Sequence, residues 1–316
     1  MPLQVDRLGT LAGSLRSAVS GKVDRDVPLV DLTTYRIGGP ASILVSPMSS
    51  DDVVAVVRAC AQEEVPWLAL GLGSNVLMSD AGFAGVVIRL GKGLDQLEAD
   101  SKDEHQSRWI IGAGMPIPRL ARLSAEAGWA GIHRLIGVPG TVGGGVFMNA
   151  GAHGQDFSRV VCRVDVVTAA GRLEHLDAAS LPWAYRDAGI RDAIVVGCHV
   201  DLERAPIGDL KLDIRKHFRW RQRGTPFKEK CCGSVFRNPG ALVGGERRTA
   251  GQLIDASGLK GFACGGAKVS ERHANYIVNT GSATAADVRA VIDAVRERVQ
   301  LEFEVELRLE VKLLGD

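Results

Sequence analysis

Residues 131 to 154 read GIHRLIGVPGTVGGGVFMNAGAHG and contain eight glycines. Glycine loses more backbone entropy on folding than any other residue. A run this rich in glycine is therefore favoured only where the chain takes positive φ angles or lets a ligand approach the main chain. Successive turns with exposed N–H groups form concave anion sites without any basic side chain, and Pro139 would stiffen such a turn. The run therefore indicates a phosphate-binding loop. The alternative is a set of tight turns, because glycine clusters are also ordinary loop punctuation.

The two most common nucleotide-binding signatures do not occur in the sequence. There is no GxxxxGK(S/T), and the glycines at 137, 140 and 143 have G-x-x-G spacing instead of the GxGxxG that opens a helix. A P-loop and a Rossmann domain are therefore disfavoured. A second glycine loop lies at 68–80, where the apolar start of LALGLGSNVLMSD leads into glycines, serine and asparagine. We expect the two loops to hold the two ends of one dinucleotide.

The composition is that of a globular protein. The chain has 316 residues, of which 46% are hydrophobic and 24% charged, and its formal net charge is +1. A chain of this length is expected to form two or three cores and can bury a cofactor. Because the net charge is close to zero, no global field attracts nucleic acid or an acidic membrane surface, and anion binding depends on local clusters. We expect neither nucleic acid nor a membrane as a partner.

The six cysteines show no CxxC pair and no zinc-like spacing, so we interpret them as reduced thiols and predict no metal site. The first residues lack the basic region, apolar core and small-residue cleavage site of a signal peptide. The sequence contains no run of about 18 apolar residues, the length needed to span a bilayer. We expect a soluble, cytoplasmic protein.

Apolar periodicity and turn residues predict the regular elements. Leucines at 3, 8, 11 and 15 indicate an amphipathic N-terminal helix, and Ser49 or Ser50 is the candidate N-cap of the next helix. A capping-box spacing at Thr284 and Asp287 opens the last helix. The predicted helices lie at 51–63, 116–127 and 284–299, and the predicted strands at 41–45, 67–70, 86–90, 109–111, 161–168, 172–176, 194–202 and 305–313. We expect strand, helix and strand at 41–70 to form a βαβ unit.

A change of composition after residues 205–208 marks the best candidate linker, and we expect a domain boundary there. From Lys211 to Lys230 eight basic residues stand against two acidic ones. This segment is either a solvated helix face or a clamp on a diphosphate, for which the planar fork of arginine is better suited than lysine.

Seven motifs occur in order along the chain: TTYRIGGPA (33–41), GLGSN (71–75), GVPGTVGG with MNAGAHG (137–154), WAYRD (183–187), CGSVFRNP (232–239), AGQLIDASGLKG (250–261) and GGAKVSERHANYIVN (265–279). Over about residues 30–315 the chain thus resembles the UDP-N-acetylenolpyruvoylglucosamine reductase (MurB) family of peptidoglycan synthesis. Only seven residues separate Arg186 from Ile194, which leaves no room for the tyrosine-bearing insertion of the longer class, so the chain resembles the shorter class.

The resemblance implies an α+β, multi-domain flavoprotein. Its FAD-binding domain would be two-lobed, of the vanillyl-alcohol-oxidase-like (PCMH) type, and a C-terminal α+β domain would bind substrate. The implied ranges are a helical extension at 1–30, the FAD-binding domain at 31–204 with its lobes divided near 68–90, the substrate-binding domain at 209–303 and a C-terminal strand at 304–316. A monomer is expected.

The resemblance also implies the ligands and their contacts. FAD would be bound noncovalently and reduced by NADPH, and His153 has no special claim to a covalent link. The expected FAD contacts are Gly71, Leu72, Gly73, Ser74, Asn75, Gly137, Pro139, Gly140, Thr141, Gly143, Gly144, Asn149, Ala150 and Gly151. The expected substrate contacts are Arg221, whose spacing from the GS motif matches only loosely, Asn238 and His273.

Three residues match the family's catalytic positions. From spacing alone Ser234 is a turn serine, Arg186 is a partner of Asp187, and Glu310 is an exposed charge on the polar side of a strand. The resemblance instead makes Ser234 the proton donor to the substrate carbon, which is plausible because a carbon that has just received hydride is a strong base. Arg186 would stabilise the substrate carboxylate in a bidentate pair. Glu310 lies in the pattern of residues 307–315.

The expected reaction reduces an enolpyruvyl sugar nucleotide to its lactyl ether, with hydride passed from NADPH through FAD. A substrate carboxylate beside Glu310 would bring two like charges together. Either Glu310 donates a hydrogen bond as the neutral acid, which we favour, or Arg186 offsets both charges.

Departures from the family pattern at Asp31, Thr225, Cys231 and Cys232 leave local substrate contacts open. Two other functions also stay open: a flavin-dependent alcohol oxidase of the same superfamily, and a nucleotide-sugar binding module without catalysis.

Overall fold

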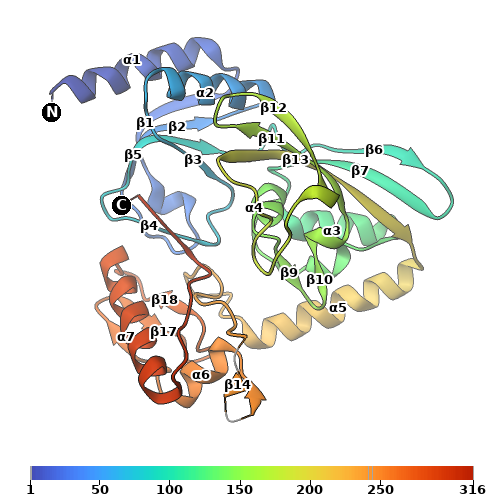
Figure 1. The fold of residues 1–316 in the computed structure, drawn as a ribbon, viewed down its shortest axis with the longest axis vertical. Helices are drawn as coiled ribbons and strands as arrows, with labels where there is room; N and C mark the ends of the chain where they lie inside the picture. Colours follow the sequence, from blue (N-terminus) through green and yellow to red (C-terminus); the bar gives the residue numbers. More distant parts are fainter. Residues whose placement is uncertain (1, 241, 244, 316) are drawn as a thin grey trace. The chain divides into compact units, whose positions relative to one another are not determined.

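The computed structural model describes residues 2–240, 242–243 and 245–315. Mixed helices and strands follow one another along the chain (Figure 1), which confirms the α+β class. Two compact units are present. The first comprises Met1–Val27, Ala41–Leu72 and Ala84–Trp220, and the second comprises Pro28–Pro40, Gly73–Phe83 and Arg221–Asp316.

The first lobe of unit 1 is a four-stranded sheet with two helices. The strand order is β1-β2-β5-β3, with bounds Lys22–Pro28, Pro40–Ser46, Phe83–Arg89 and Trp67–Leu70. Helices α1 (Pro2–Ala18) and α2 (Ser50–Gln62) lie side by side on this lobe (Figure 1), and both contribute to one buried cluster with the sheet. Ser49 accepts the N–H of Asp52 and is the N-cap of α2, as predicted. In the βαβ segment, β5 lies between β2 and β3 in the sheet.

The second lobe of unit 1 is built on a larger sheet. Its order is β12-β11-β13-β7-β6, with bounds Leu173–Asp177, Val161–Thr168, Ala193–Arg204, Gln106–Gly112 and Leu97–Lys102, and β8 (Trp129–Ala130) pairs with β13. β11 and β12 form the predicted antiparallel hairpin. Helices α3 (Ile117–Glu126) and α4 (Val142–Phe147), with the small hairpin β9 (Gly151–Ala152) and β10 (Gln155–Asp156), complete this lobe.

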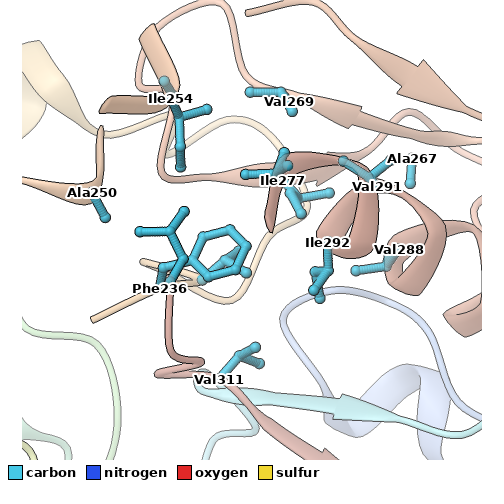
Figure 2. Packing of buried hydrophobic residues seen from close by; sticks show 14 of the residues in the cluster. Phe236, Ala250, Ile254, Ala267, Val269, Ile277, Val288, Val291, Ile292 and Val311 are labelled. Atoms are coloured by element: carbon cyan, nitrogen blue, oxygen red, sulfur yellow. The ribbon is translucent and has the colours of Figure 1, made fainter. Parts of the chain in front are cut away.

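Unit 2 has its own core. It contains the parallel pair β4 (Val76–Met78) and β19 (Lys312–Leu314), the sheet β16 (Ala263–Cys264), β17 (Ala267–Val269) and β18 (Ile277–Asn279), the hairpin β14 (Leu242–Val243) and β15 (Glu246–Arg247), and helices α6 (Ala250–Ala256) and α7 (Ala285–Phe303). Apolar side chains from α6, α7, β17 and β18 meet in one cluster (Figure 2). The capping box of Thr284 and Asp287 opens α7, as predicted.

The predicted linker is irregular only at Ala205 and Pro206. Helix α5 (Ile207–Gly224) begins inside it, and the two compact units divide within that helix, between Trp220 and Arg221. The change of composition after residues 205–208 indicated a boundary, whereas Ile207 and Gly208 are already helical, and Leu210 is the buried residue of that helix. The domain ranges implied by the family remain predictions.

The predicted strand at 305–313 is largely wrong as a regular element. Only Lys312–Leu314 is a strand, and Leu309 makes an isolated bridge to Phe236. The burial alternation itself is present, because Val305, Leu307 and Val311 are buried. The segment is extended and packed on one face but pairs continuously with no neighbouring strand.

Candidate functional site

In unit 1, the glycine run forms the loop before α4, and Thr141 is the residue at which that helix begins. Its hydroxyl makes no capping hydrogen bond. The Oγ1 atom is buried and has no hydrogen-bond partner among the residues that the structure describes. A buried hydroxyl without a partner is costly, so this atom is suited to a ligand that supplies an acceptor or donor.

Glycines surround this hydroxyl. A Cβ on Gly71, at the end of β3, would lie 2.5 Å from Thr141 Oγ1, and one on Gly144 would lie 3.9 Å from it with nothing closer. Gly140 has φ 126°, where L side chains are strained. Gly144 therefore leaves open space beside the Thr141 hydroxyl for close approach of a ligand, as a dinucleotide phosphate requires, whereas Gly71 packs directly against that hydroxyl. The residues present fit FAD.

Other glycines of the run serve packing. A Cβ on Gly143 would lie 2.8 Å from the Ala113 Cβ, and one on Gly145 would lie 2.5 Å from the Phe157 ring. The amides of Val142 and Gly143 already donate to the carbonyls of Met115 and Ala113 at 2.8 Å. The expectation that the whole segment from 137 to 144 offers main-chain donors is therefore wrong for Val142 and Gly143, because these two amides fasten α4 to the chain before α3.

Arg186 lies in a tight turn and not in a strand. Its φ is 59°, and Ala184 and Asp187 bridge across the turn. Arg186 Nη2 donates to the carbonyl of Gly151 at 3.1 Å. Asp187 binds Arg191 at 2.6 Å. Asp187 thus has a partner in the arginine four residues later, and its pairing with Arg186 stays a prediction.

Asn149 joins this turn to the glycine run. Its Nδ2 donates to the carbonyl of Ala184 at 3.0 Å, and its Oδ1 accepts the N–H of Ser158 at 3.1 Å. Both ends of the buried amide are thus engaged within unit 1. The structure places Asn149 as a support for the turn that carries Arg186, and FAD binding by Asn149 stays a prediction.

Three further predicted contacts lie on the same run. Gly137 is buried, Pro139 is exposed, and Ala150 donates its N–H to Gly145 at 2.7 Å. Leu72 follows Gly71 and is 39% exposed. Their contacts with FAD remain predictions.

Sequence reasoning missed Arg89, at the end of β5. Its guanidinium donates to the carbonyl of Gly71, and burial lowers its pKa below the usual value. Arginine stays charged over the accessible pH range, so a positive charge lies next to Gly71 of the second glycine loop. A single arginine at a strand end carries no signal that sequence reasoning could have used.

His153 is a turn residue with φ 55°, and it packs on α5. Its ring stacks on His217 with centroids 4.1 Å apart and meets the edge of Trp220 at 5.1 Å. The basic segment therefore contacts the end of the glycine run within unit 1.

In unit 2, the candidate catalytic residues Ser234 and Glu310 lie on neighbouring segments. Glu310 N–H donates to the carbonyl of Val235 at 2.8 Å. Ser234 directly precedes Val235 and follows Gly233, whose φ is 87°. Both Ser234 and Glu310 are half-buried. The two segments are thus held in register where a substrate could meet a hydroxyl and a carboxyl group.

The second glycine loop supports Glu310. Asn75 Nδ2 donates to the Glu310 carbonyl at 3.2 Å, and the Asn75 carbonyl accepts the N–H of Lys312 at 3.0 Å. Gly73 has φ 62°, and a Cβ there would lie 2.3 Å from the Leu32 carbonyl, so this glycine is required by packing. Ser74 is half-buried.

Arg221 and His273 belong to one electrostatic neighbourhood. Arg221 Nε is buried without a hydrogen-bond partner among the described residues. Burial, together with the charges of Lys260 and Arg221, lowers the pKa of His273. Its Nδ1 accepts the N–H of Asn275 at 3.2 Å, so the neutral ring carries its proton on Nε2. Both side chains offer donors, as an anionic ligand requires.

Asn238 has a structural bond. Its Oδ1 accepts the N–H of Ala250 at 3.2 Å, at the start of α6. Substrate binding by Asn238 remains a prediction.

Burial disfavours ionisation of the two cysteines before Gly233. Burial raises the pKa of both Cys231 and Cys232. A thiol must ionise to act as a nucleophile, so this environment disfavours nucleophilic chemistry at both residues. Cys232 is buried in the core of unit 2 with Tyr35, and Cys231 packs against that core.

Over the described residues, no group of three or more histidine, cysteine, aspartate or glutamate side chains has an arrangement that could hold a metal ion. Likewise, no helix in residues 2–240, 242–243 and 245–315 is long and apolar enough to cross a membrane.

Comparison with known proteins gives two domain matches. Residues 41–177 match the family described as "FAD binding domain". Residues 225–314 match "UDP-N-acetylenolpyruvoylglucosamine reductase, C-terminal domain".

Full-length relatives carry one name. The chain is 39% identical over 308 residues to the UDP-N-acetylenolpyruvoylglucosamine reductase of Halalkalibacterium halodurans, with 97% of this chain and 99% of the relative covered. It is 36% identical over 304 residues to the enzyme of that name from Bacillus subtilis, with 95% and 97% covered. A crystal structure of UDP-N-acetylenolpyruvylglucosamine reductase (MurB) from Thermus caldophilus has a TM-score of 0.78 and 32% identity, with 93% of this chain and 99% of that chain covered.

Proposed function

Because the chain belongs to the UDP-N-acetylenolpyruvoylglucosamine reductase family, we propose that it reduces UDP-N-acetylglucosamine enolpyruvate to UDP-N-acetylmuramate. The family resemblance seen in the motifs is confirmed, and the protein is an FAD-dependent oxidoreductase of peptidoglycan precursor synthesis. An alcohol oxidase and a non-catalytic binding module are not favoured.

FAD, when bound, supplies hydride for the enol ether carbon, and NADPH is proposed as the source of that hydride. Gly71, Thr141 and Gly144 would receive the cofactor, because the buried Thr141 hydroxyl lies beside two residues without side chains. Arg89 would add a positive charge behind Gly71. The other predicted FAD contacts are part of the same proposal.

Ser234 is proposed to protonate the carbon next to the one that receives hydride. Arg186 is proposed to bind the substrate carboxylate, where negative charge develops, and Glu310 to hydrogen-bond the reacting group. Oriented donors around developing charge are the largest catalytic contribution in many enzymes. The observation that carries this proposal is the 2.8 Å hydrogen bond from Glu310 N–H to the Val235 carbonyl, which holds Glu310 beside the segment of Ser234.

Arg221, His273 and Asn238 are proposed to bind the UDP-sugar. An unpartnered buried guanidinium nitrogen supports this for Arg221, since diphosphates are acceptors. We also propose that the enzyme is a monomer and that it acts in the cytoplasm. Its product would be needed for cell shape, cell division and the cell cycle.

The test is to mix the flavin-loaded chain with NADPH and then with UDP-N-acetylglucosamine enolpyruvate, and to analyse the product by mass spectrometry. Formation of UDP-N-acetylmuramate supports the proposal. Flavin that is reoxidised by oxygen alone, with no lactyl ether formed, would favour an oxidase.

A further inference from the structure

The segment that carries Ser234 is held by Asn275, a residue of the C-terminal unit outside the proposed catalytic set. Asn275 Nδ2 donates to the carbonyl of Phe236 at 2.8 Å, and its Oδ1 accepts the Phe236 N–H at 2.9 Å. The Asn275 carbonyl also accepts the N–H of Val235 at 2.9 Å. Three hydrogen bonds thus join one asparagine to the two residues that follow Ser234.

We propose that Asn275 is a positioning residue for the proton-transfer step, acting through the backbone that carries Ser234 and Glu310. The inference rests on the function proposed above. It adds a requirement that the motifs did not reveal: the side-chain amide of Asn275 sets where the serine hydroxyl lies.

The amide of Asn275 has one suitable orientation. The side chain is 4% exposed, and its donor and acceptor both face the main chain of Phe236. If the amide were turned over, Asn275 Nδ2 would face the Phe236 N–H and Oδ1 would face the Phe236 carbonyl. Donor would then face donor and acceptor would face acceptor, which is unfavourable in a buried environment. The Phe236 ring is buried in the core of unit 2 (Figure 2), so the far end of the segment is anchored as well.

The segment held by Asn275 is also hydrogen-bonded to the main chain of Glu310. Val235 donates to Asn275 on one side and accepts the N–H of Glu310 on the other. Phe236 and Leu309 bridge next to it. Loss of the Asn275 amide therefore leaves two polar groups of Phe236 without partners and loosens the spacing between Ser234 and Glu310.

The expected effect is kinetic and specific to one half-reaction. A misplacement of about 1 Å at a reacting group costs about a hundredfold in rate. We expect Asn275→Ala to slow reoxidation of the reduced flavin by saturating substrate about a hundredfold. Reduction by NADPH does not need the Ser234 proton and should stay within about twofold of wild type, a difference of only about 0.4 kcal/mol.

Asn279 provides a matched control. It is 6% exposed and also buried in unit 2, where Nδ2 donates to the Tyr35 carbonyl and Oδ1 accepts the N–H groups of Gly281 and Ala283. Asn279→Ala should therefore cost similar stability without releasing the Ser234 segment.

The experiment uses the full flavin-loaded chain, reduced with dithionite and mixed with UDP-N-acetylglucosamine enolpyruvate in a stopped-flow instrument. Reoxidation rates in H₂O and D₂O are compared for wild type, Asn275→Ala and Asn279→Ala, and the rate at which NADPH reduces the oxidised flavin is measured separately for the same three proteins. We expect Asn275→Ala alone to show the slowed reoxidation, with a larger solvent isotope effect because proton transfer becomes more limiting. If Asn275→Ala does not fold, Asn275→Asp gives the same comparison, since it keeps the shape and the acceptor for the Phe236 N–H.

Equal slowing by the two alanine variants, or equal slowing of reoxidation and NADPH reduction, would show that Asn275 only stabilises the fold and would overturn the inference. Wild-type reduced enzyme that is not reoxidised by the substrate would instead contradict the proposed function, and the positioning role would be lost with it.

Discussion

At the residue scale, the proposed contact of Thr141 with FAD predicts opposite effects of one substitution on stability and on cofactor affinity. Replacing Thr141 with valine keeps the shape of the side chain and removes the buried hydroxyl that lacks a partner. Without flavin we expect the variant to be more stable than wild type by about 1 kcal/mol, because an unsatisfied buried polar group costs about 1–3 kcal/mol. With flavin we expect the opposite sign, since a hydrogen bond to a charged phosphate contributes about 1.5–3 kcal/mol.

Two measurements check these signs. Urea denaturation of the flavin-free protein reports stability, and fluorescence titration should show FAD affinity reduced about ten- to a hundredfold. Ser124→Ala is a suitable control, because Ser124 is also fully buried in unit 1 but its hydroxyl already donates to Ala121. An unchanged FAD affinity in Thr141→Val would remove Thr141 from the proposed contacts.

Ser234 offers a sharper kinetic prediction. Loss of a positioned proton donor costs about a hundred- to ten-thousandfold. Ser234→Ala should therefore slow flavin reoxidation by the substrate by this factor and leave reduction by NADPH nearly intact. Stopped-flow absorbance separates the two half-reactions, and similar slowing of both would argue for a role in binding or folding.

Glu310 is suited to side-chain replacement because its main chain is fixed by Val235 and Asn75. If Glu310 acts as a hydrogen-bond donor, Glu310→Gln should retain much more activity than Glu310→Ala, since the amide also donates. Steady-state turnover of flavin-loaded variants tests this. Equal activities for the two variants would favour the alternative in which Arg186 balances the charge.

At the element scale, Asp52 holds α2 to the turn that follows α1. Burial alone would raise its pKa, but N–H groups of Met48, Ser20 and Gly21 and the Ser20 hydroxyl lower it below the usual value. A carboxyl group with a lowered pKa in the folded state stabilises above its unfolded pKa of about 4, and that stability is lost as pH falls through the folded value.

Asp52→Asn should therefore be less stable than wild type at neutral pH, on the order of 2 kcal/mol for charge-assisted hydrogen bonds. The difference between the two proteins should shrink as pH falls below about 4. Thermal unfolding from neutral to acid pH checks this. A difference that stays constant over the whole range would mean that the Asp52 charge contributes nothing.

The helices and strands also show which structural features sequence patterns can predict. The capping residues Ser49 and Thr284 and the hairpin of β11 and β12 were predictable, because each depends on neighbours close in sequence. The extent of the strand at 305–313 was not, since alternation reports which face is buried and not whether a partner strand is present. The boundary expected at 205–208 differs from the division of the two compact units, because a change of composition does not stop a helix.

At the scale of the whole molecule, motif order along the chain predicted the fold class and the family, and both are confirmed. The roles of individual residues within the motifs could not be predicted from the sequence. Gly143 serves packing, while Gly144 leaves space beside Thr141, although the two are adjacent in sequence. Asn275 was part of a quoted motif, but its hydrogen bonds to Phe236 depend on a contact between distant segments.

The central claim is that this chain uses bound FAD to reduce an enolpyruvyl sugar nucleotide. One anaerobic stopped-flow experiment on the purified, flavin-loaded protein tests it most directly. NADPH should bleach the visible flavin band, and UDP-N-acetylglucosamine enolpyruvate should then restore it with one UDP-N-acetylmuramate formed per flavin reoxidised. A flavin band that NADPH bleaches but the substrate does not restore in the absence of oxygen would contradict the account.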